Sequence, residues 1–383
     1  MSTTPHVLIL GAGAAGAAAA RSLASRDDVK VTLITRAGEV PYTRMLIKGV
    51  AFGPVSPELI RLPLPEIDVI PDTAVSIDTS VQEVRLDSGR QRAYDALIIA
   101  TGSMPRALPA GVITPGRATD PRRISMLHSL EDALHIRDLL AGLGRPARVA
   151  IYGGGIIAAE TASSLHTDGH QVMMIARSGI PGIGAFGTPV AEHIAALHSA
   201  TVQTRFGRTI QHVDEADSGV AITLDDENTL VADFLLVALG TVPSAPAPWS
   251  NGVAVDDHLR AEAAHVYAAG GVATHDDATL GTWRIDHWED AAAQGTHAAL
   301  AALHDLGFGD DPGAYLPRSP FMAMVYGRMI SGVGFIGSSG RRRPDDQEFV
   351  VEHETAGTVS GVTSVDAVGT VYQWAPRLHG VSV

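Results

Sequence analysis

Near its N-terminus the chain reads Val7-Leu8-Ile9-Leu10-Gly11-Ala12-Gly13-Ala14-Ala15-Gly16. The four apolar residues are typical of a short buried strand, and the alanine-rich run up to Leu23 predicts a helix. Residues 29–34 (VKVTLI) are rich in β-branched residues and predict the next strand. Together these residues predict a strand, a glycine turn, a helix and a second strand in direct succession.

The glycine turn has the form that binds the pyrophosphate of a dinucleotide. Gly11 permits the tight turn, and Gly13 lets backbone N–H groups approach the phosphates. Gly16 lets the helix pack closely on the strand, and the N-terminus of that helix offers partial positive charge to an anion. A single turn of this kind is weak evidence, because glycine- and alanine-rich turns also arise from plain helix packing.

The same order of features recurs later in the chain. Residues 148–152 predict a strand, a helix is expected to run to about Gly169, and residues 171–175 predict another strand. The turn between the first strand and the helix reads Gly153-Gly154-Gly155-Ile156-Ile157-Ala158. A second pair of buried strands ends at Ala100-Thr101-Gly102 and at Gly240, each before a proline-bearing segment. The two repeats have nearly the same spacing and predict two homologous nucleotide-binding domains, hence electron transfer between two bound nucleotides.

Length and composition narrow the classes of protein that remain. At about 150 residues per domain, 383 residues predict two to three domains. A net charge of −14 makes nucleic acid a poor partner, because phosphate binding needs clustered positive charge. The chain has no cysteine, which excludes disulfides, thiolate metal sites and a redox-active dithiol. Residues 1–6 lack the charged region of a secretory signal, and no run predicts a membrane span, so a cytoplasmic protein is expected.

Several further motifs follow in a fixed order and resemble those of a known family. They are Pro41-Tyr42-Thr43-Arg44 with Lys48, Leu130-Glu131-Asp132-Ala133, Ala158-Ala159-Glu160, Val266-Tyr267-Ala268-Ala269-Gly270, and Trp288-Glu289-Asp290-Ala291-Ala292-Ala293-Gln294-Gly295. With the two glycine turns, they resemble the FAD-dependent pyridine-nucleotide oxidoreductases, in the ferredoxin reductase branch that includes putidaredoxin and rubredoxin reductases. The larger disulfide-reducing relatives use a cysteine pair beside the flavin, so a chain without cysteine does not belong to that branch.

The resemblance implies an α/β fold with two Rossmann-like dinucleotide-binding domains of the glutathione-reductase-like three-layer ββα type and a small α+β C-terminal domain. The FAD-binding domain is expected in two segments, 1–112 and 243–316. The NAD(P)H-binding domain is expected at 113–242 and the C-terminal domain at 317–383. The expected cofactors are FAD and either NADPH or NADH.

The resemblance also implies roles for individual residues, each of which has a plainer interpretation. Lys48 is expected beside flavin N5, where a cation stabilises reduced flavin, and is otherwise a solvated lysine. Arg44 is expected at an FAD phosphate, or else in a surface ion pair. Glu160 is expected to orient the nicotinamide, although acids also stabilise helix N-termini. Trp288 is expected to stack on the flavin or gate the nicotinamide, with His287 beside it, and is otherwise a core residue.

Two acids that the family uses to hold FAD are missing. Thr35-Arg36 stands where an acid normally accepts a hydrogen bond from the adenosine ribose, and Glu39 lies further on, out of register. Gly270-Gly271 replaces the glycine–aspartate pair whose aspartate meets the ribityl chain or phosphate. Each loss removes a charge-assisted hydrogen bond worth roughly 1.5–3 kcal/mol. FAD is therefore expected to be held weakly or through Arg36 and backbone groups, and a relative that has lost FAD is an alternative.

The second nucleotide site departs from the family pattern at a different position. After the strand at 172–175 the chain reads Ala176-Arg177-Ser178, where a site that prefers NADH carries an acid. An arginine and a hydroxyl suit the 2′-phosphate of NADPH, which is slightly favoured over NADH. Arg177 is otherwise a solvated arginine of the kind that follows the acid in many relatives of the family.

The predicted function is a flavoprotein reductase that passes electrons from NAD(P)H to a small iron–sulfur protein of an oxygenase system. One alternative is an NAD(P)H oxidase or quinone reductase without a protein partner, and another is a non-enzymatic nucleotide-binding protein. Arg341-Arg342-Arg343 is the most basic run and is either a docking patch or a solvated loop. His275-Asp276-Asp277 lacks metal-ligand spacing and is expected in a solvated loop, without a metal. A homodimer is compatible with the sequence.

Overall fold

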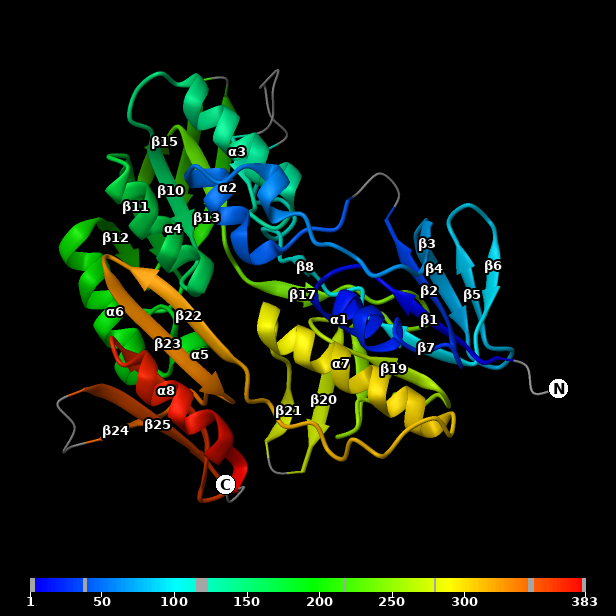
Figure 1. Cartoon of the computed structure of the whole chain (residues 1–383). Helices are drawn as coiled ribbons and strands as arrows, with labels where there is room; N and C mark the ends of the chain where they lie inside the picture. Colours follow the sequence, from blue (N-terminus) through cyan, green and yellow to red (C-terminus); the bar gives the residue numbers. More distant parts are fainter. Residues whose placement is uncertain are drawn as a thin grey trace. The chain divides into compact units, whose positions relative to one another are not determined.

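A computed structural model describes residues 4–36, 40–114, 123–216, 218–278, 280–343 and 348–380 (Figure 1). The chain forms two compact units, each assembled from three segments. Unit 1 consists of Met1–Met45, Glu58–Met104 and Thr241–Ser319. Unit 2 consists of Leu46–Pro57, Pro105–Gly240 and Pro320–Val383.

Unit 1 is built on a five-stranded parallel sheet with the strand order β19-β7-β1-β2-β3. Its strands are β1 (His6–Leu10), β2 (Lys30–Thr35), β3 (Asp68–Pro71), β7 (Ala96–Ile99) and β19 (Val266–Ala268). In the centre of the sheet Ile9 lies opposite Leu33 on one side and Ile98 on the other. All three side chains are fully buried, as expected for a parallel sheet covered on both faces.

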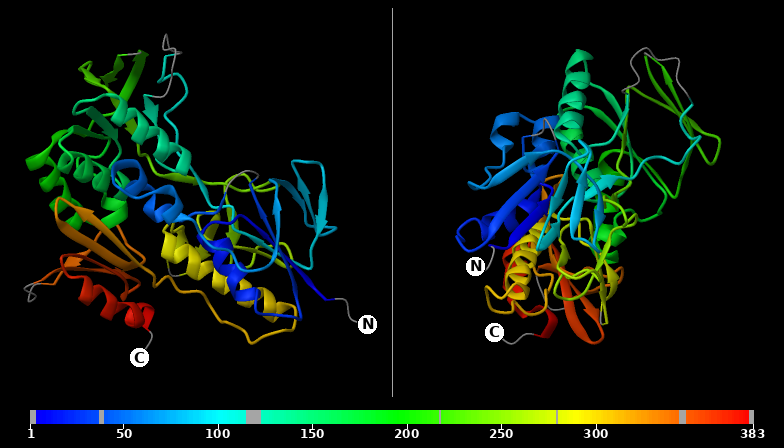
Figure 2. Two further views of the ribbon diagram at one scale, coloured as in Figure 1. Left: turned by 45° about the horizontal axis from the view of Figure 1, so that its top comes forward. Right: turned by 90° about the vertical axis from the view of Figure 1, so that its right-hand side faces the viewer.

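Two helices pack together in unit 1, α1 (Ala14–Leu23) and α7 (Trp288–Asp305). They lie side by side in both views of Figure 2. A Cβ at Gly295 would lie 2.0 Å from the carbonyl oxygen of Ala15, so this approach requires glycine. Two three-stranded sheets complete the unit: β4 (Ala74–Asp78), β5 (Glu83–Leu86) and β6 (Gln91–Ala93), and β18 (Val253–Val255), β20 (Ala273–Asp277) and β21 (Gly281–Trp283). The 3₁₀ helix η2 (Pro57–Ile60) lies at the start of the second segment.

Unit 2 repeats the parallel sheet with the order β12-β11-β10-β16-β9. Its strands are β9 (Ile124–Ser125), β10 (Arg148–Tyr152), β11 (Gln171–Ala176), β12 (Gln203–Phe206) and β16 (Phe234–Val237). Its helices are α2 (Ile47–Phe52), α3 (Leu130–Gly142), α4 (Ile156–Thr167), α5 (Ile183–Phe186) and α6 (Thr188–Thr201). A three-stranded antiparallel sheet joins β13 (Ile210–Ala216), β14 (Gly219–Leu224) and β15 (Thr229–Ala232).

The C-terminal part of unit 2 is a five-stranded antiparallel sheet with the order β22-β23-β26-β25-β24. Its strands are β22 (Pro320–Val325), β23 (Arg328–Gly334), β24 (Arg341–Arg342), β25 (Phe349–Thr355) and β26 (Thr358–Val365), followed by α8 (Val368–Trp374) and η3 (Ala375–Gly380). Phe321 and Val325 of this sheet share one buried cluster with Phe186, Val190 and Ile194. This common core explains why residues 320–383 join the second nucleotide-binding sheet in one compact unit instead of standing apart.

The unit boundaries differ from the predicted domain boundaries at 112 and 242. Val112 is buried in the core of unit 2, so the chain has already entered that unit by this residue. The two connections pair as short strands, β8 (Ser103–Pro105) with β17 (Thr241–Pro243). The segment Leu46–Pro57 also belongs to unit 2, because α2, which follows η1 (Arg44–Leu46), packs on α3 and α4.

The predicted α/β class with two Rossmann-like domains is confirmed by two parallel sheets of related strand order. In each sheet the strand before the glycine turn is central: β1 pairs with β2 and β7, and β10 pairs with β11 and β16. Among the described residues no helix is long and apolar enough to cross a membrane.

Candidate functional site

The first glycine turn lies at the carboxyl end of β1 in unit 1. Gly11 has a φ of +98°, and a Cβ there would lie 2.4 Å from the carbonyl oxygen of Ala100. A Cβ at Gly16 would lie 1.8 Å from the carbonyl oxygen of Gly11, so both positions require glycine for the packing of the protein itself. Ala14 and Ala15 begin α1 and are buried.

Gly13 differs from the other two glycines of the turn. No atom of the described chain lies within 4 Å of the position where its Cβ would be. Gly13 is also the N-cap of α1, and no side chain of the described residues caps this helix with a hydrogen bond there. An open glycine before an uncapped helix N-terminus fits a bound pyrophosphate.

Two further loops border this turn. Thr101 donates a hydrogen bond from its hydroxyl to the carbonyl oxygen of Ser244, and Gly102 has a φ of +71°. Gly270 follows β19, and its N–H donates to Oε1 of Gln294 at 2.8 Å. A Cβ at Gly270 would lie 3.3 Å from Cβ of Ala15, which places this loop against the start of α1.

The space beside Gly271 is filled by a carboxylate. A Cβ at Gly271 would lie 2.3 Å from Oδ1 of Asp286 and 3.2 Å from Cβ of Ser103. Asp286 Oδ2 accepts hydrogen bonds from the hydroxyls of Ser103 at 2.7 Å and Thr241 at 2.5 Å. The sequence motifs did not single out Asp286, although it stands directly before the His287-Trp288 pair.

Arg36 and Arg44 lie on the surface of unit 1. Arg36 follows the last residue of β2, at the carboxyl edge of the sheet where the missing acid was expected. Arg44 begins η1 and is exposed. Glu39, the alternative acid, lies outside the described residues.

Trp288 is the first residue of α7, and His287 is its N-cap. Both side chains are partly buried, so the tryptophan is not a core residue. Burial lowers the pKa of His287, while the neighbouring Asp286 carboxylate raises it. Within the first turn of α7, Asp290 is buried and accepts hydrogen bonds from Tyr315 at 2.8 Å and Gln294 at 2.6 Å.

The second glycine turn lies at the carboxyl end of β10 in unit 2 and has the same construction. A Cβ at Gly153 would lie 2.1 Å from the carbonyl oxygen of Ala238, which precedes Gly240. Gly155 is the uncapped N-cap of α4, and no atom of the described residues lies within 4 Å of its Cβ position. Ile156 and Ile157 begin the helix, and the side chain of Ile157 is exposed beside this open turn. The second turn therefore fits a second pyrophosphate.

Arg177 follows β11, the strand next to β10. Its side chain is exposed and forms no ion pair within the described parts of the chain. Ser178 is already engaged, because its hydroxyl donates to the carbonyl oxygen of Ile180 at 2.7 Å and accepts from Ile180 N–H at 3.2 Å. Of the two residues predicted to meet a 2′-phosphate, Arg177 is the one that is available.

Lys48 and Glu160 come together in unit 2 as an ion pair between Nζ and Oε2. Lys48 lies on α2 and Glu160 on α4, and 24% and 14% of their side-chain surfaces are exposed. The other oxygen of Glu160 accepts from the backbone N–H of Met324 on β22 at 3.2 Å. Burial lowers the pKa of Lys48 to about 8, whereas the carboxylate of Glu160 favours the charged ammonium.

The prediction of a solvated loop at residues 275–277 is wrong, and of the two interpretations of the basic run at residues 341–343 the loop is excluded. Residues 273–277 form strand β20, and His275 is buried with its ring 3.7 Å from that of Trp283, because stacking on an aromatic residue removes it from solvent. Arg341 and Arg342 form strand β24, so the run is not a loop. Arg341 lies 3.7 Å from Glu354, Arg343 lies 3.4 Å from Glu352, and Arg342 stacks on Phe349, so much of the positive charge is neutralised locally.

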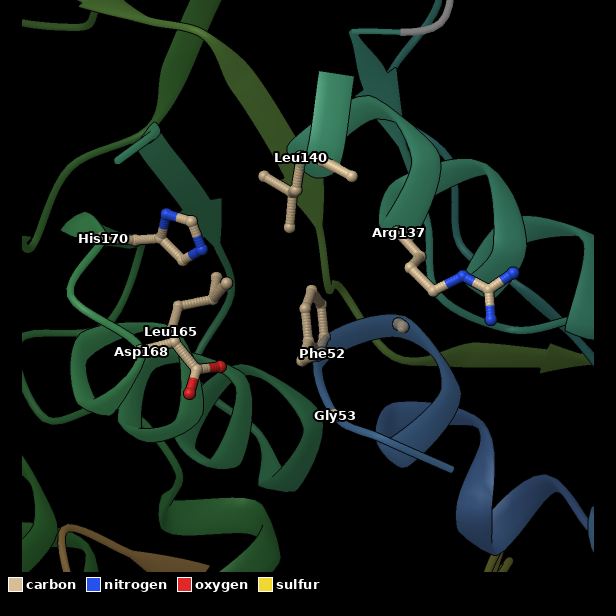
Figure 3. A pocket seen from close by; sticks show the side chains of 9 residues that line it. Phe52, Gly53, Arg137, Leu140, Leu165, Asp168 and His170 are labelled. Atoms are coloured by element: carbon tan, nitrogen blue, oxygen red, sulfur yellow. The ribbon is translucent and has the colours of Figure 1, made fainter. Parts of the chain in front are cut away.

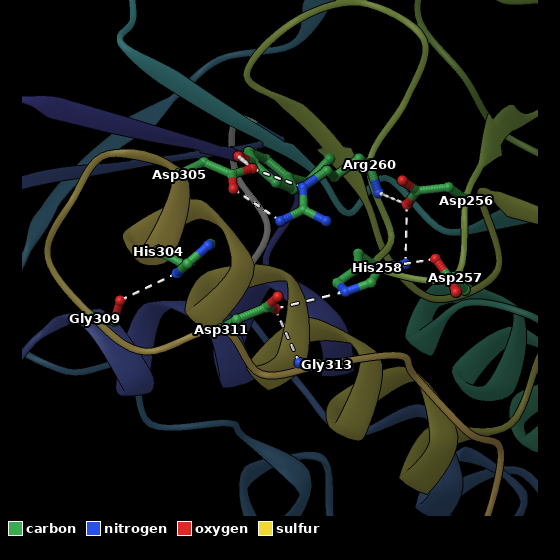
Figure 4. A network of polar contacts seen from close by, with 10 residues as sticks. Asp256, Asp257, His258, Arg260, His304, Asp305, Gly309, Asp311 and Gly313 are labelled. Carbon is green, nitrogen blue, oxygen red and sulfur yellow. Dashed lines mark hydrogen bonds and ion pairs between the residues drawn. The ribbon is translucent and has the colours of Figure 1, made fainter.

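Two other surface features of the described chain do not belong to the nucleotide sites. A hollow of about 300 Å³ in unit 2 is lined by Phe52, Leu140, Leu165 and His170 among others, and none of the predicted site residues lines it (Figure 3). In unit 1, His258 lies between Asp257 at 2.8 Å and Asp311 at 3.5 Å (Figure 4). Backbone N–H groups of the two segments also donate to their acids, since His258 and Arg260 donate to Asp256 and Gly313 donates to Asp311, so these contacts account for the arrangement.

Known proteins support the resemblance found in the sequence. Residues 5–295 match the family model of the pyridine nucleotide-disulphide oxidoreductases. The chain is 30% identical over 346 residues to the ferredoxin–NAD(+) reductase component of an anthranilate 1,2-dioxygenase system from Burkholderia cepacia, covering 83% of this chain and 79% of that protein. It is 27% identical to rubredoxin–NAD(+) reductase from Pseudomonas putida over 351 residues, which cover 86% of each chain.

Solved structures agree with the fold. The crystal structure of the protein Fdr9 superposes with a TM-score of 0.81 at 25% identity and covers 95% of this chain and 92% of its own. Putidaredoxin reductase, in its covalent complex with putidaredoxin, superposes with a TM-score of 0.80 at 24% identity. The match covers 96% of this chain and 91% of the putidaredoxin reductase chain. The predicted resemblance is confirmed, and the chain belongs to the pyridine nucleotide-disulphide oxidoreductase family.

Proposed function

We propose that the chain is a flavoprotein reductase that takes hydride from NAD(P)H and delivers electrons to a small iron–sulfur protein of an oxygenase system. The observation that carries this proposal is the pair of open glycine turns, one on each parallel sheet, in a chain without cysteine. With no dithiol available in this chain, electrons go from the flavin directly to the acceptor. The names of two relatives, an anthranilate dioxygenase reductase component and a rubredoxin reductase, support an iron–sulfur acceptor.

The residues of unit 1 fit FAD. Gly11, Gly13 and Gly16 with Ala14 and Ala15 form the cradle for the pyrophosphate, because Gly13 is open at the uncapped start of α1 while Gly11 and Gly16 let the turn and the helix pack closely. Ala100, Thr101, Gly102, Gly270 and Gly271 line the loops on one side of this cradle, and Arg36 lies on the other. When bound, FAD supplies the ability to accept a hydride and release electrons one at a time.

Side chains of both units then take separate roles. Arg44 binds an FAD phosphate, and Trp288 with His287 supports the flavin at the start of α7. Lys48 provides a cation whose Nζ is held by Glu160, and Glu160 in turn positions the nicotinamide. Gly153, Gly155, Ile156, Ile157 and Gly240 form the cradle for the pyrophosphate of NAD(P)H.

The nucleotide preference proposed for this chain is NADPH over NADH. The two relatives are named for NAD(+), whereas this chain has an exposed arginine without an ion-pair partner in the described chain at the carboxyl end of β11. A free guanidinium at this edge matches a 2′-phosphate in charge and geometry. The cytoplasmic setting and a homodimer stay predictions.

An anaerobic titration tests the proposal. The purified protein is expected to show the absorbance of bound flavin, to bleach with one equivalent of NADPH, and then to reduce an added ferredoxin or rubredoxin. A protein that shows no flavin absorbance, even after incubation with FAD, would contradict the reductase. Rapid turnover with oxygen or quinone and none with the iron–sulfur proteins would favour the oxidase or quinone reductase instead.

A further inference from the structure

We propose that Asp286 supplies the carboxylate that this chain lacks at position 271 and accepts a hydrogen bond from a ribityl hydroxyl of FAD. This inference rests on the proposed function, because it assigns a binding residue within the same FAD site. It also explains how a chain with Gly271 in place of an acid keeps a carboxylate at that place.

The first argument is steric. The carboxylate of Asp286 fills the space in which a side chain at position 271 would begin, since Oδ1 is 2.3 Å and Cγ 3.0 Å from the position of a Cβ there. The carboxylate of Asp286 in this orientation therefore requires glycine at position 271. A negative charge therefore lies beside position 271, where the sequence itself has no acid, and it is carried by the segment before α7.

The second argument is that only one oxygen of this carboxylate accepts hydrogen bonds from the described residues of the protein. Oδ2 accepts from Ser103 at 2.7 Å and Thr241 at 2.5 Å, and the guanidinium of Arg284 lies 3.4 Å away. Arg284 also donates to the carbonyl oxygens of Gly271 and Thr241, each at 3.0 Å, so one network ties the three loops together. Within the described chain Oδ1 accepts no hydrogen bond, and 31% of the side-chain surface is exposed.

The charge state agrees with a role as acceptor. The hydroxyls of Thr241 and Ser103 and the positive charges of Arg284 and Arg44 outweigh burial and keep the pKa of Asp286 below its ordinary value. Asp286 is therefore ionised at neutral pH. An ionised carboxylate accepts from hydroxyls and repels phosphates, so its partner on FAD is a hydroxyl.

The order of the strands in the sheet indicates which hydroxyls of FAD lie near Asp286. The pyrophosphate turn follows β1, which is central in the order β19-β7-β1-β2-β3. Arg36 follows β2 on one side, where the adenosine ribose of a dinucleotide is expected. Ser103 and Gly271 come after β7 and β19 on the opposite side. Asp286 therefore faces the flavin half of FAD, whose hydroxyls are on the ribityl chain.

A comparison of the affinities for FAD and for ADP tests which half of the cofactor Asp286 contacts, because ADP lacks the ribityl chain and the flavin. Apoprotein is titrated with FAD by quenching of flavin fluorescence and with ADP by calorimetry, for the natural chain and for Asp286→Asn. The variant is expected to bind FAD about tenfold or more weakly, because a charge-assisted hydrogen bond is lost, and to bind ADP within about twofold of the natural chain. Asp87→Asn, an exposed acid of the same unit, removes the same charge and is expected to change neither affinity.

Moving the carboxylate back to position 271 provides a rescue. Gly271→Asp alone is expected to weaken FAD binding, because its Cβ collides with Asp286. Asp286→Ala alone is expected to weaken it at least as much as Asp286→Asn. The double variant Gly271→Asp with Asp286→Ala is expected to recover most of the lost affinity, which a merely structural role of Asp286 does not predict. Thermal unfolding of each apoprotein reports whether the fold is kept.

The outcomes that overturn the inference differ from those that overturn the proposed function. If the natural chain binds FAD and accepts electrons from NADPH while Asp286→Asn binds FAD equally well, the reductase stands and the role of Asp286 is refuted. Equal weakening of FAD and ADP refutes the ribityl assignment, as does a double variant no better than its parents. If the natural chain binds no FAD, the proposed function and this inference fall together.

Discussion

Lys48 and Glu160 derive their properties from each other and from their burial. Each is a charged side chain with at most about a quarter of its surface exposed, and each is the other's counter-ion. Breaking a buried pair by removing one partner costs more than replacing both, because the remaining charge stays desolvated. Glu160 also holds the N–H of Met324, so a glutamine at this position keeps the hydrogen bond and loses only the charge.

The pair should therefore show strong coupling in a double-mutant cycle. Glu160→Gln is expected to lower the free energy of unfolding by about 1–3 kcal/mol, since the Lys48 ammonium is left without its counter-ion. Combining it with Lys48→Met is expected to restore part of that loss. Urea unfolding of the natural chain, both single variants and the double variant measures the coupling. Additive effects would show that the two charges act independently.

The surroundings of Arg177 predict that it affects the preference for NADPH over NADH and not the stability of the fold. Arg177→Ala is expected to raise the apparent KM for NADPH about tenfold or more and to leave the KM for NADH within about twofold, because NADH lacks the 2′-phosphate. Steady-state reduction of ferricyanide with each nucleotide gives both constants. Arg21→Ala, an exposed arginine of unit 1, removes the same charge and is the control. Equal changes for the two nucleotides would refute the assignment.

At the scale of elements, α7 combines a candidate site residue at its start with a buried acid in the same first turn. Its first residue is Trp288, and Asp290 lies among the buried residues of the same helix. Burial raises the pKa of Asp290 from 3.8 to about 6, although the hydrogen bonds from Tyr315 and Gln294 oppose this shift. Gln294 also holds the N–H of Gly270, so the acid is linked to the loop that borders the FAD cradle.

The raised pKa of Asp290 predicts a pH dependence of stability. The folded state binds this proton more tightly than the unfolded state. The stabilisation that protonated Asp290 gives the folded state is therefore present below about pH 4 and is lost as the pH rises through 6. The loss amounts to about 3 kcal/mol, at 1.36 kcal/mol per pKa unit. Asp290→Asn is therefore expected to gain stability relative to the natural chain between pH 4 and pH 7.

Denaturant unfolding at a series of pH values checks this expectation. Glu289→Gln changes an exposed acid of the same helix turn and is expected to leave the pH dependence unaltered. Parallel curves for the natural chain and Asp290→Asn would mean that Asp290 titrates near its ordinary pKa.

At the scale of the whole molecule, net charge opposes an acidic partner. The chain has a net charge of −14, and in the described structure its most basic run is offset by Glu352 and Glu354. Long-range repulsion slows encounter between like-charged proteins and is screened by salt, since the Debye length falls from about 30 Å at 0.01 M to about 8 Å at 0.15 M.

Salt should therefore speed electron transfer to an acidic acceptor. The kcat/KM for an acidic ferredoxin is expected to rise severalfold, on the order of 3–10, between 0.01 and 0.15 M ionic strength. With cytochrome c, which is cationic, the same measurement is expected to give the opposite trend. A kcat/KM that falls with salt for the acidic acceptor would reveal a local basic docking surface that outweighs the net charge.

Much of the fold and part of the candidate site follow from local patterns. The strands before Gly11 and Gly153 lie where their apolar runs predict, because four consecutive buried positions beside a glycine turn leave few alternatives. The entry of the chain into unit 2 before Val112, and the core that the C-terminal sheet shares with α5 and α6, were not predictable in the same way. Whether residues 320–383 pack against α6 or stand alone depends on contacts between side chains far apart in sequence.

The sequence by itself determined the family, the two dinucleotide cradles and the absence of thiol chemistry, because each depends on residue types at short, regular spacing. Only the tertiary structure decided what compensates for Gly271. Asp286 is 15 residues away along the chain, and its carboxylate reaches that space through loops held by Ser103, Thr241 and Arg284. The same holds for the pairing of Lys48 with Glu160, since α2 must pack against α4 before two charges 112 residues apart can meet.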